Sequence, residues 1–361
     1  MKRTFAIFLS LVLSLCAGLG SAPGTGAVSV RIEADSINSN GWENHGPIQA
    51  SVNLVVIAPA APAVIYAAPE NGYLYKSSDG GASWEKAHLG YGPQTVRALA
   101  VDPLDEQTVY IGWMDHGLYK TTDGGQTWSD IGADLACPYI LSLAIDPQTP
   151  QTVYAGTLCG MLRSRNGGDT WSEINTGLPL AFVYALVIDP LTPATLYAGI
   201  ENKSEEPGSE QDCVFKSEDN GDHWVSISDG LPNYARAQAL AIDPISPSTL
   251  YAGISGGGKG IYKSVNGGGD WQYINSQFVG VAALAVDPQN PQTIYAGMGE
   301  GVLSTMPKGV YKSTDGGYIW QDANLGLDSI VRGLAIDPLD PARVFAASAW
   351  DGIFFSQHGG A

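Results

Sequence analysis

The chain has 361 residues with 45 glycines and 22 prolines, and its 36 acidic against 18 basic residues give a formal net charge of −18. This acidic balance, without a basic patch, excludes nucleic acid and anionic membrane surfaces as expected partners. Regular strand signals and the lack of helix-period segments after the first twenty residues indicate a single all-β domain.

The first 27 residues have the pattern of a secretory signal. Met1-Lys2-Arg3 precedes an apolar run over residues 5–19, and Thr25-Gly26-Ala27 is a small-x-small cleavage site. The apolar run is too short to remain as a membrane span. We therefore expect an exported protein, either periplasmic or secreted to the extracellular space, with no membrane insertion after the signal is removed. A lipoprotein anchored at Cys16 is the weaker alternative, because the bulky Leu15 precedes that cysteine.

After an expected linker over residues 28–37, residues 38–361 consist of one repeating unit. Its most regular part is Ser/Thr-x-Asp/Asn-x-Gly-x-x-Trp. This motif occurs six times, at Ser77–Trp84, Thr121–Trp128, Ser164–Trp171, Ser217–Trp224, Ser264–Trp271 and Ser313–Trp320. The tryptophans lie 44, 43, 53, 47 and 49 residues apart. That period is the length of a four-stranded propeller blade.

Three further signals precede each motif in a fixed order, so the unit is interpreted as four short strands, here named a to d. Strand a is an apolar run that ends in Asp-Pro, as in Leu99–Pro103. Strand b follows a turn and is rich in β-branched and aromatic residues, as in Thr152–Gly156. Strand c is Gly-aliphatic-Tyr-Lys-Ser, as in Gly260–Ser264, and it runs into the motif whose tryptophan opens strand d.

The chain contains seven strand-a signals, six that end in Asp-Pro and one variant that ends in Ala58-Pro59, but only six complete motifs. The missing copy is divided between the two ends of the domain. Gly352–Gly360 contains strand c and a truncated motif with His358 at the Asp position, while Trp42 has the sequence surroundings of a motif tryptophan. We therefore predict a seventh blade whose strand d comes from the N-terminal side. A ring closed in this way has no free sheet edge.

The connection from strand c to strand d is predicted to be a tight hairpin that explains each fixed residue of the motif. Asp or Asn accepts hydrogen bonds from nearby amides, glycine takes a positive φ, and tryptophan buries a large ring between blades. Asn166 and Asn266 replace Asp in two copies, which suits an acceptor better than a catalytic or metal-binding carboxylate. We assign this structural role to six residues: Asp79, Asp123, Asn166, Asp219, Asn266 and Asp315.

The motif resembles the Asp box, or bacterial neuraminidase repeat, and the resemblance covers nearly all of residues 38–361. It implies an all-β, seven-bladed β-propeller similar to the sortilin luminal propeller, the photosystem II assembly-factor propeller and the single propellers of xyloglucan-specific endoglucanases. In these relatives the boxes lie on the outer periphery, away from the ligand face. A sialidase is not expected, because the Arg-Ile-Pro signature is missing and the predicted ring has seven blades. The fold itself says little about function.

Three cysteines remain after the signal: Cys137, Cys159 and Cys213. Their spacing is not a zinc pattern. Cys137 opens a strand a and Cys159 lies in the b-to-c turn of the same blade, on the same face. We predict a disulfide between these two, with Cys213 as an odd thiol or a rival partner. Three unpaired thiols are the alternative.

Propeller ligands usually meet the face that carries the d-to-a and b-to-c loops. Guanidinium groups on that face would bind a carboxylate, and aromatic side chains would pack against a sugar or a peptide. We predict a ligand-binding surface made of Arg97, Arg236, Arg332, Tyr91, Tyr184, Trp113 and Trp350. The longest b-to-c insertion, residues 201–212, is interpreted as a solvated loop.

These features favour a non-catalytic binding or assembly scaffold for a protein, peptide or glycan. We expect it to act as a monomer without a cofactor or a metal. The alternative is a glycoside hydrolase or lyase that acts on an extracellular polysaccharide. Its candidate carboxylate pair is Asp115 and Asp351, which lie in equivalent turns of two blades. Repetition alone also produces such pairs.

Overall fold

The computed structural model describes residues 41–46, 51–70, 72–88, 95–203, 212–256, 259–275, 278–299 and 308–360. The expected signal peptide and linker lie outside these residues. Within them, the chain forms strands and turns. In this part of the chain there is no helix with the length and apolar character to cross a membrane.

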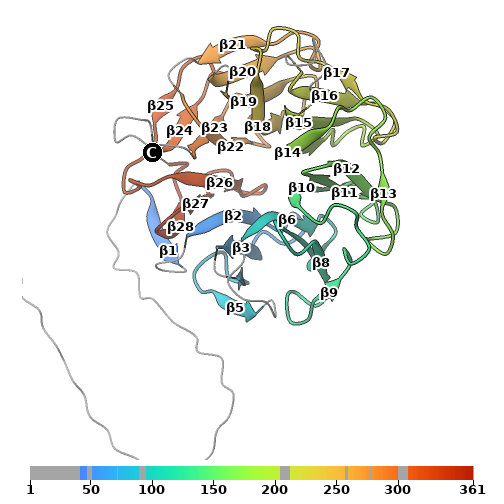
Figure 1. Ribbon diagram of the computed structural model, residues 1–361. Helices are drawn as coiled ribbons and strands as arrows, with labels where there is room; N and C mark the ends of the chain where they lie inside the picture. Colours follow the sequence, from blue (N-terminus) through green and yellow to red (C-terminus); the bar gives the residue numbers. More distant parts are fainter. Residues whose placement is uncertain are drawn as a thin grey trace, which may run out of the picture.

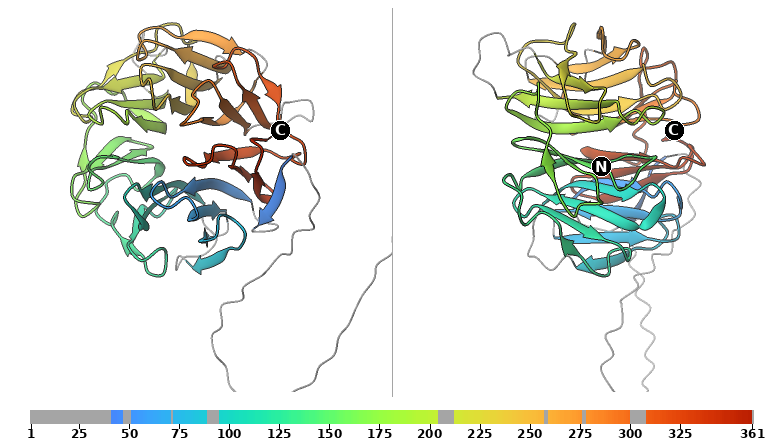
Figure 2. Two further views of the ribbon diagram at one scale, coloured as in Figure 1. Left: turned by 180° about the vertical axis from the view of Figure 1, so that it is seen from behind. Right: turned by 90° about the vertical axis from the view of Figure 1, so that its right-hand side faces the viewer.

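The strands form seven four-stranded antiparallel blades arranged in a ring (Figures 1 and 2). The innermost strands are β2 (Val52–Ile57), β6 (Val96–Asp102), β10 (Ile140–Ile145), β14 (Ala181–Ile188), β18 (Ala235–Ile242), β22 (Val281–Val286) and β26 (Val331–Ile336). Next to them lie β3 (Ile65–Pro69), β7 (Asp105–Trp113), β11 (Val153–Thr157), β15 (Leu196–Asn202), β19 (Leu250–Gly256), β23 (Ile294–Met298) and β27 (Val344–Ser348).

The two outer positions of each blade carry the strands that flank the repeated motif. The third strands are β4 (Tyr73–Ser77), β8 (Leu118–Thr121), β12 (Gly160–Ser164), β16 (Val214–Ser217), β20 (Gly260–Ser264), β24 (Gly309–Ser313) and β28 (Gly352–Ser356). The outermost are β5 (Glu85–His88), β9 (Ser129–Asp130), β13 (Ser172–Glu173), β17 (Val225–Ser226), β21 (Gln272–Asn275), β25 (Gln321–Asp322) and β1 (Glu43–Gly46). The expected order a to d therefore runs from the centre of the ring to its rim.

The core lies between neighbouring blades. Every residue of β3, β11, β23 and β27 is buried, because these strands are covered on both faces. This explains why they are continuous apolar runs rather than alternating ones. A single bridge between Glu201 of β15 and Arg236 of β18 also joins the fourth and fifth blades into one sheet.

The seventh blade is completed by β1, which pairs antiparallel with β28 (Figure 1). Glu43 lies opposite Phe355. Trp42, only 4% exposed, donates its Nε1 hydrogen to the carbonyl oxygen of Ala323 over 2.6 Å. Its ring also lies against Gly360, in the truncated motif. The prediction of a seven-bladed ring closed by an N-terminal strand is confirmed.

The Asp boxes form the hairpins at the rim of the ring. In the first box, Asp79 Oδ1 accepts hydrogen bonds from the Ser77 hydroxyl and the Ser83 amide, each at 2.8 Å. Gly81 has a φ of +93°, and a Cβ there would lie 2.9 Å from the Phe345 ring of the adjacent blade. Only glycine satisfies both demands without strain.

Asparagine serves the same turn in two copies. Asn166 Oδ1 accepts from the Ser164 hydroxyl and from the Thr170 amide, each at 2.9 Å. Five tryptophan rings extend the contact between blades by donating Nε1–H to a backbone carbonyl of the preceding blade. These are Trp42, Trp84, Trp171, Trp224 and Trp271. The geometry thus accounts for the motif residues as parts of turns and of the contacts between blades.

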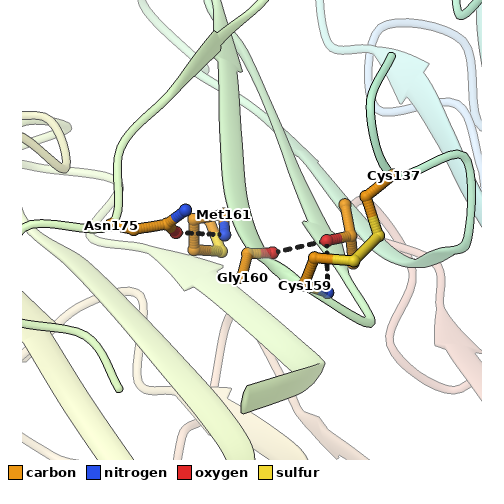
Figure 3. Close-up of a disulfide and its surroundings, with 6 residues drawn as sticks. Cys137, Cys159, Gly160, Met161 and Asn175 are labelled. Atoms are coloured by element: carbon orange, nitrogen blue, oxygen red, sulfur yellow. Dashed lines mark hydrogen bonds between the residues drawn. A yellow bond between two sulfur atoms is a disulfide. The ribbon is translucent and has the colours of Figure 1, made fainter. Parts of the chain in front are cut away.

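Cys137 and Cys159 form a disulfide with Cα atoms 6.2 Å apart, which is the pairing expected from the sequence (Figure 3). It joins the connection into β10 to the turn between β11 and β12. The turn is held further by the Thr157 hydroxyl, which donates to the Gly160 carbonyl and accepts from the Cys159 amide, each over 2.9 Å. The third cysteine, Cys213, is a buried free thiol, and burial raises its pKa to about 12.

Candidate binding site at the channel mouth

Each of the seven innermost strands carries a β-bulge at the same place. The pairing register with the second strand shifts across one residue in every blade. These seven residues, here called the bulge ring, all lie six positions before the proline that ends strand a: Asn53, Arg97, Leu141, Tyr184, Gln238, Ala282 and Arg332. A bulge re-aims a side chain, and bulges are common beside functional sites.

All seven members of the bulge ring line one cavity of about 490 Å³. It opens on the face that carries the d-to-a and b-to-c loops, and this opening is here called the mouth. Deeper in the channel a second cavity of about 260 Å³ is lined by the next residues of the same strands, including a layer of leucines: Leu99, Leu143, Leu186, Leu240, Leu284 and Leu334. The volume of the outer cavity, about 490 Å³, is within the range of small-ligand sites.

One side of the mouth is cationic. Three bulge-ring residues from adjacent blades form this arc: Arg332, Asn53 and Arg97. Arg332 donates from Nη1 to Asn53 Oδ1 and to Glu70 Oε1, each over 2.8 Å. Asn53 is 4% exposed, and its amide nitrogen has no partner in the described part of the chain. Arg97 is exposed, and none of the described carboxylates forms an ion pair with it.

A cluster of polar side chains around Arg236 joins the fourth and fifth blades at the mouth. Glu201 Oε2 lies 3.6 Å from Arg236 Nη1 and accepts a hydrogen bond from the Tyr184 hydroxyl over 3.0 Å. Its other oxygen pairs with Lys203. Burial acts to raise the pKa of Glu201, but the bonds from Lys203 and Tyr184 outweigh it and lower that pKa. Glu201 is therefore an ionised partner that neutralises Arg236.

The wall of the mouth beside Arg97 is apolar. It consists of Met114, Leu141, Leu158 and Phe182. The Cys137–Cys159 disulfide lies next to this wall, and the Leu158 amide donates to the Tyr139 carbonyl over 3.1 Å. The disulfide therefore braces the turn that presents Leu158 to the cavity.

The structure brings together four of the seven residues expected to bind a ligand. Arg97, Arg236, Arg332 and Tyr184 all line the mouth. Tyr91 lies outside the described residues. The other two are tryptophans and do not line this cavity.

The expectation that Trp113 is a surface aromatic is wrong. Trp113 ends β7, pairs with Val96 and is only 1% exposed, because both faces of this strand are covered by neighbouring blades. Trp350 is 60% exposed, but it lies in a turn away from the cavity lining.

Sequence reasoning placed Glu70 on this face but missed Glu201 as the partner of Arg236. Residues 201–212 were expected to be a solvated loop, but β15 continues to Asn202, and this places Glu201 on a strand against Arg236. It also missed the bulge ring as a set. The available signal was positional, since counting six residues back from each repeat proline aligns all seven members.

The candidate hydrolase pair is not part of the mouth. Asp115 and Asp351 are both exposed in b-to-c turns, and neither lines the cavity. The Asp351 backbone carbonyl accepts a hydrogen bond from the Asn44 side chain. Among the described residues, no group of three or more His, Cys, Asp or Glu side chains has the geometry to hold a metal ion.

The DUF6242 beta propeller domain family matches residues 71–281 of the chain. The chain belongs to this family. No curated protein matches it in sequence.

Solved structures extend the likeness to the whole ring. The GH74 xyloglucanase from Xanthomonas campestris is 22% identical with a TM-score of 0.68, over 88% of this chain and 53% of the xyloglucanase. YCF48 bound to D1 peptide is 20% identical with a TM-score of 0.65, over 88% and 97%. YCF48 from Cyanidioschyzon merolae is 17% identical with a TM-score of 0.64, over 87% and 98%.

This chain thus spans about half the length of the xyloglucanase. The expected resemblance to xyloglucanase and assembly-factor propellers holds at the level of the fold. At these identities the likeness extends no further than the fold.

Proposed function

We propose that the chain is an exported, non-catalytic binding scaffold that holds a peptide segment of a partner protein at the channel mouth. The observation that carries this proposal is the bulge ring, which directs side chains from all seven blades into one cavity. The arc of Arg332, Asn53 and Arg97 lies beside an aliphatic wall. Such a mouth suits a ligand that combines a carboxylate with apolar groups.

A peptide fits this mouth better than a glycan. Sugars stack on the open faces of aromatic rings, but here Lys203 Nζ lies 4.6 Å from the centre of the Phe182 ring and the Arg236 guanidinium lies 5.4 Å from that of Tyr184. The remaining wall is aliphatic. A propeller of the same fold, YCF48, has been solved with the D1 peptide bound.

The two carboxylates that pair with arginines of the mouth, Glu70 and Glu201, support binding rather than hydrolysis. A glycoside hydrolase needs one carboxyl group that keeps its proton and a second that works as a base or nucleophile. Glu70 and Glu201 are both paired with arginines, and the pKa of Glu201 is lowered. Glu201 therefore lacks the raised pKa of a general acid. The Glu70 carboxylate is already engaged by Arg332.

The proposal is tested by presenting the purified mature protein with a random peptide library and, separately, with xyloglucan and acidic oligosaccharides. The double variant Arg97→Ala/Arg332→Ala should lose peptide binding by about tenfold or more, because charge-assisted bonds to the carboxylate disappear. The control variant Asp115→Asn/Asp351→Asn should bind as the wild type does.

Three outcomes would contradict the proposal. The first is peptide binding that is unchanged in the arginine variant. The second is recognition of the oligosaccharides alone. The third is product formation from xyloglucan that disappears in the Asp115→Asn/Asp351→Asn variant, which would support the glycoside hydrolase instead.

A further inference from the structure

Two of the three arginines at the mouth already hold a carboxylate of the protein itself. Arg332 is paired with Glu70 at 2.8 Å, and Arg236 lies 3.6 Å from Glu201. Arg97 is exposed, and no described acidic side chain pairs with it. Of the three arginine charges at the mouth, only that of Arg97 is therefore left to attract a ligand's carboxylate.

We propose that the mouth is a single-carboxylate site, in which Arg97 takes the ligand's carboxylate and Glu70 and Glu201 exclude ligands that carry a second one. This inference rests on the proposed function and deepens it by naming the ligand class. The ligand is a peptide with one carboxylate attached next to an apolar group. Glu70 and Glu201 are specificity-determining residues in this arrangement.

Glu201 is too well held to give way to a competing anion. Its two carboxylate oxygens engage Tyr184, Lys203 and Arg236, and its backbone forms the bridge to the fifth blade. A second ligand carboxylate approaching Arg236 meets this fixed negative charge in a partly buried site, where repulsion is stronger than in bulk water. Specificity obtained by repelling the wrong ligand is common at binding sites.

Glu70 is also held in place, beside Arg332, and would repel a second carboxylate there. Its backbone amide donates to the Ser51 carbonyl over 2.9 Å, which fixes the residue at the end of β3. Its carboxylate shares Arg332 Nη1 with the Asn53 side chain. An incoming anion would have to displace both acceptors to use that nitrogen.

The surroundings of Arg97 define what the single carboxylate is attached to. Arg97 lies between Asn53 of the first blade and Leu141 of the third in the bulge ring. Met114, Leu141 and Leu158 continue the wall away from it. A carboxylate bound at Arg97 therefore brings the atoms beside it against aliphatic side chains, and an attached apolar group removes that surface from water.

The test uses four matched pools of tetrapeptides, with Asp and Glu left out of the random positions, that differ in the number and position of carboxylates. One pool ends in leucine amide and has no carboxylate. A second ends in leucine with a free carboxylate, and a third ends in leucine amide with one internal Asp, so these two distinguish a terminal from a side-chain carboxylate. A fourth ends in Asp with a free terminus and has two.

The wild-type protein should retain a one-carboxylate pool about tenfold better than the pool without a carboxylate and the pool with two. Mass spectrometry of the captured peptides measures this. In Glu201→Gln the two-carboxylate pool should gain about tenfold, because the repelling charge is removed while the side chain keeps its shape. Glu70→Gln should act in the same direction from the other side. Glu173→Gln, the same change on the exposed strand β13, should alter nothing.

Arg97→Gln distinguishes a failure of the specificity inference from a failure of the proposed function. If it abolishes capture of the one-carboxylate pool while neither glutamate variant gains two-carboxylate peptides, the specificity inference is wrong and the proposed function stands. If the leucine amide pool without a carboxylate binds as well as the others, the inference is also wrong. Capture of the one-carboxylate pools that is unchanged in Arg97→Gln would overturn both the specificity inference and the proposed function. Thermal unfolding of each variant confirms that it is folded before its binding is compared.

Discussion

The rim of the ring and its mouth are built from the same repeat, yet they differ in how alike the copies are. At the rim, the central acceptor is always Asp or Asn in the six complete boxes. In the bulge ring, seven equivalent positions hold Asn, Arg, Leu, Tyr, Gln, Ala and Arg. The uniform positions are those where backbone hydrogen bonds require one kind of side chain. The divergent positions are those where the backbone fixes only a direction.

The difference has a simple physical basis. A box acceptor such as Asp79 completes a network with Ser77 and Ser83, and most other side chains leave those donors unpaired. A bulge-ring residue such as Gln238 sits at a cavity wall, where the register shift alone sets its orientation. In a repeat protein, the positions at which copies disagree are therefore the ones free to serve a ligand. Five stability measurements test this contrast.

The largest effect is expected where the rim also closes the ring. Trp42→Ala removes a ring that is 4% exposed, together with its hydrogen bond to Ala323, and should lower the free energy of unfolding by about 3–5 kcal/mol. Trp350→Ala is the matched control, because that side chain is 60% exposed. Equal denaturation midpoints for the two variants would contradict the closure argument.

A smaller loss is expected from the disulfide that braces the mouth. The cysteines are 22 residues apart, and opening a loop of this size should cost about 3 kcal/mol. The variant Cys137→Ser/Cys159→Ser should therefore unfold at a lower temperature than the wild type. Its melting temperature should not respond to a reductant, whereas that of the wild type should fall. A wild-type protein indifferent to reductant would show that the bond contributes nothing.

The Asp boxes should show a moderate effect that depends on the kind of side chain. Asp79→Ala removes the acceptor for Ser77 and Ser83 and should cost about 1 kcal/mol. Asp79→Asn should cost less than half of that, because Asn166 already fills the same role in its own box. A full loss in the asparagine variant would mean that the negative charge itself is required.

The same residue makes stability depend on pH. Burial acts to raise the pKa of Asp79, but hydrogen bonds from Ser83 and Ser77 lower it below its ordinary value of 3.8. The folded state thus holds the proton less tightly than the unfolded state. The stabilisation is complete above the ordinary pKa and is lost as the pH falls through the lowered one. Denaturation midpoints from pH 6 down to pH 2 should decline less steeply in Asp79→Asn than in the wild type.

The smallest effect on stability is expected in the bulge ring. Arg97→Ala and Gln238→Ala should each change the free energy of unfolding by no more than about 0.5 kcal/mol, because neither side chain completes a turn or a core. Chemical denaturation measures both. A loss above 1 kcal/mol would show that the ring positions are part of the fold, and the contrast between rim and mouth would fail.

Much of the fold follows from the repeat, because its signals are local. The tryptophan spacing, the Asp-Pro turns and the divided seventh motif are visible in the sequence and predict the blades, their strand order and the closure by Trp42. The disulfide follows from two cysteines placed on one face of one blade. Each of these depends on short-range rules for turns and strands.

The mouth was harder to predict because it depends on register and on the exact ends of strands. A bulge leaves no mark in the apolar pattern, so Asn53 and Leu141 look like ordinary strand residues. Glu201 is expected in a loop because the strand-b signal ends at Gly199, whereas β15 continues to Asn202. Trp113 looked exposed because the covering of a strand end by the next blade is a tertiary effect.

The pairing of β1 with β28 also imposes an order in time. Trp42 is made near the beginning of the domain, while Gly360, against which its ring packs, is made more than three hundred residues later. Local hairpins can form blade by blade as the chain emerges, but the ring remains open until its last strand arrives. Long-range contacts of this kind slow folding. A chain delivered N-terminus first would therefore carry its bulge-ring residues in separate blades and acquire a complete mouth only when synthesis of the domain ends.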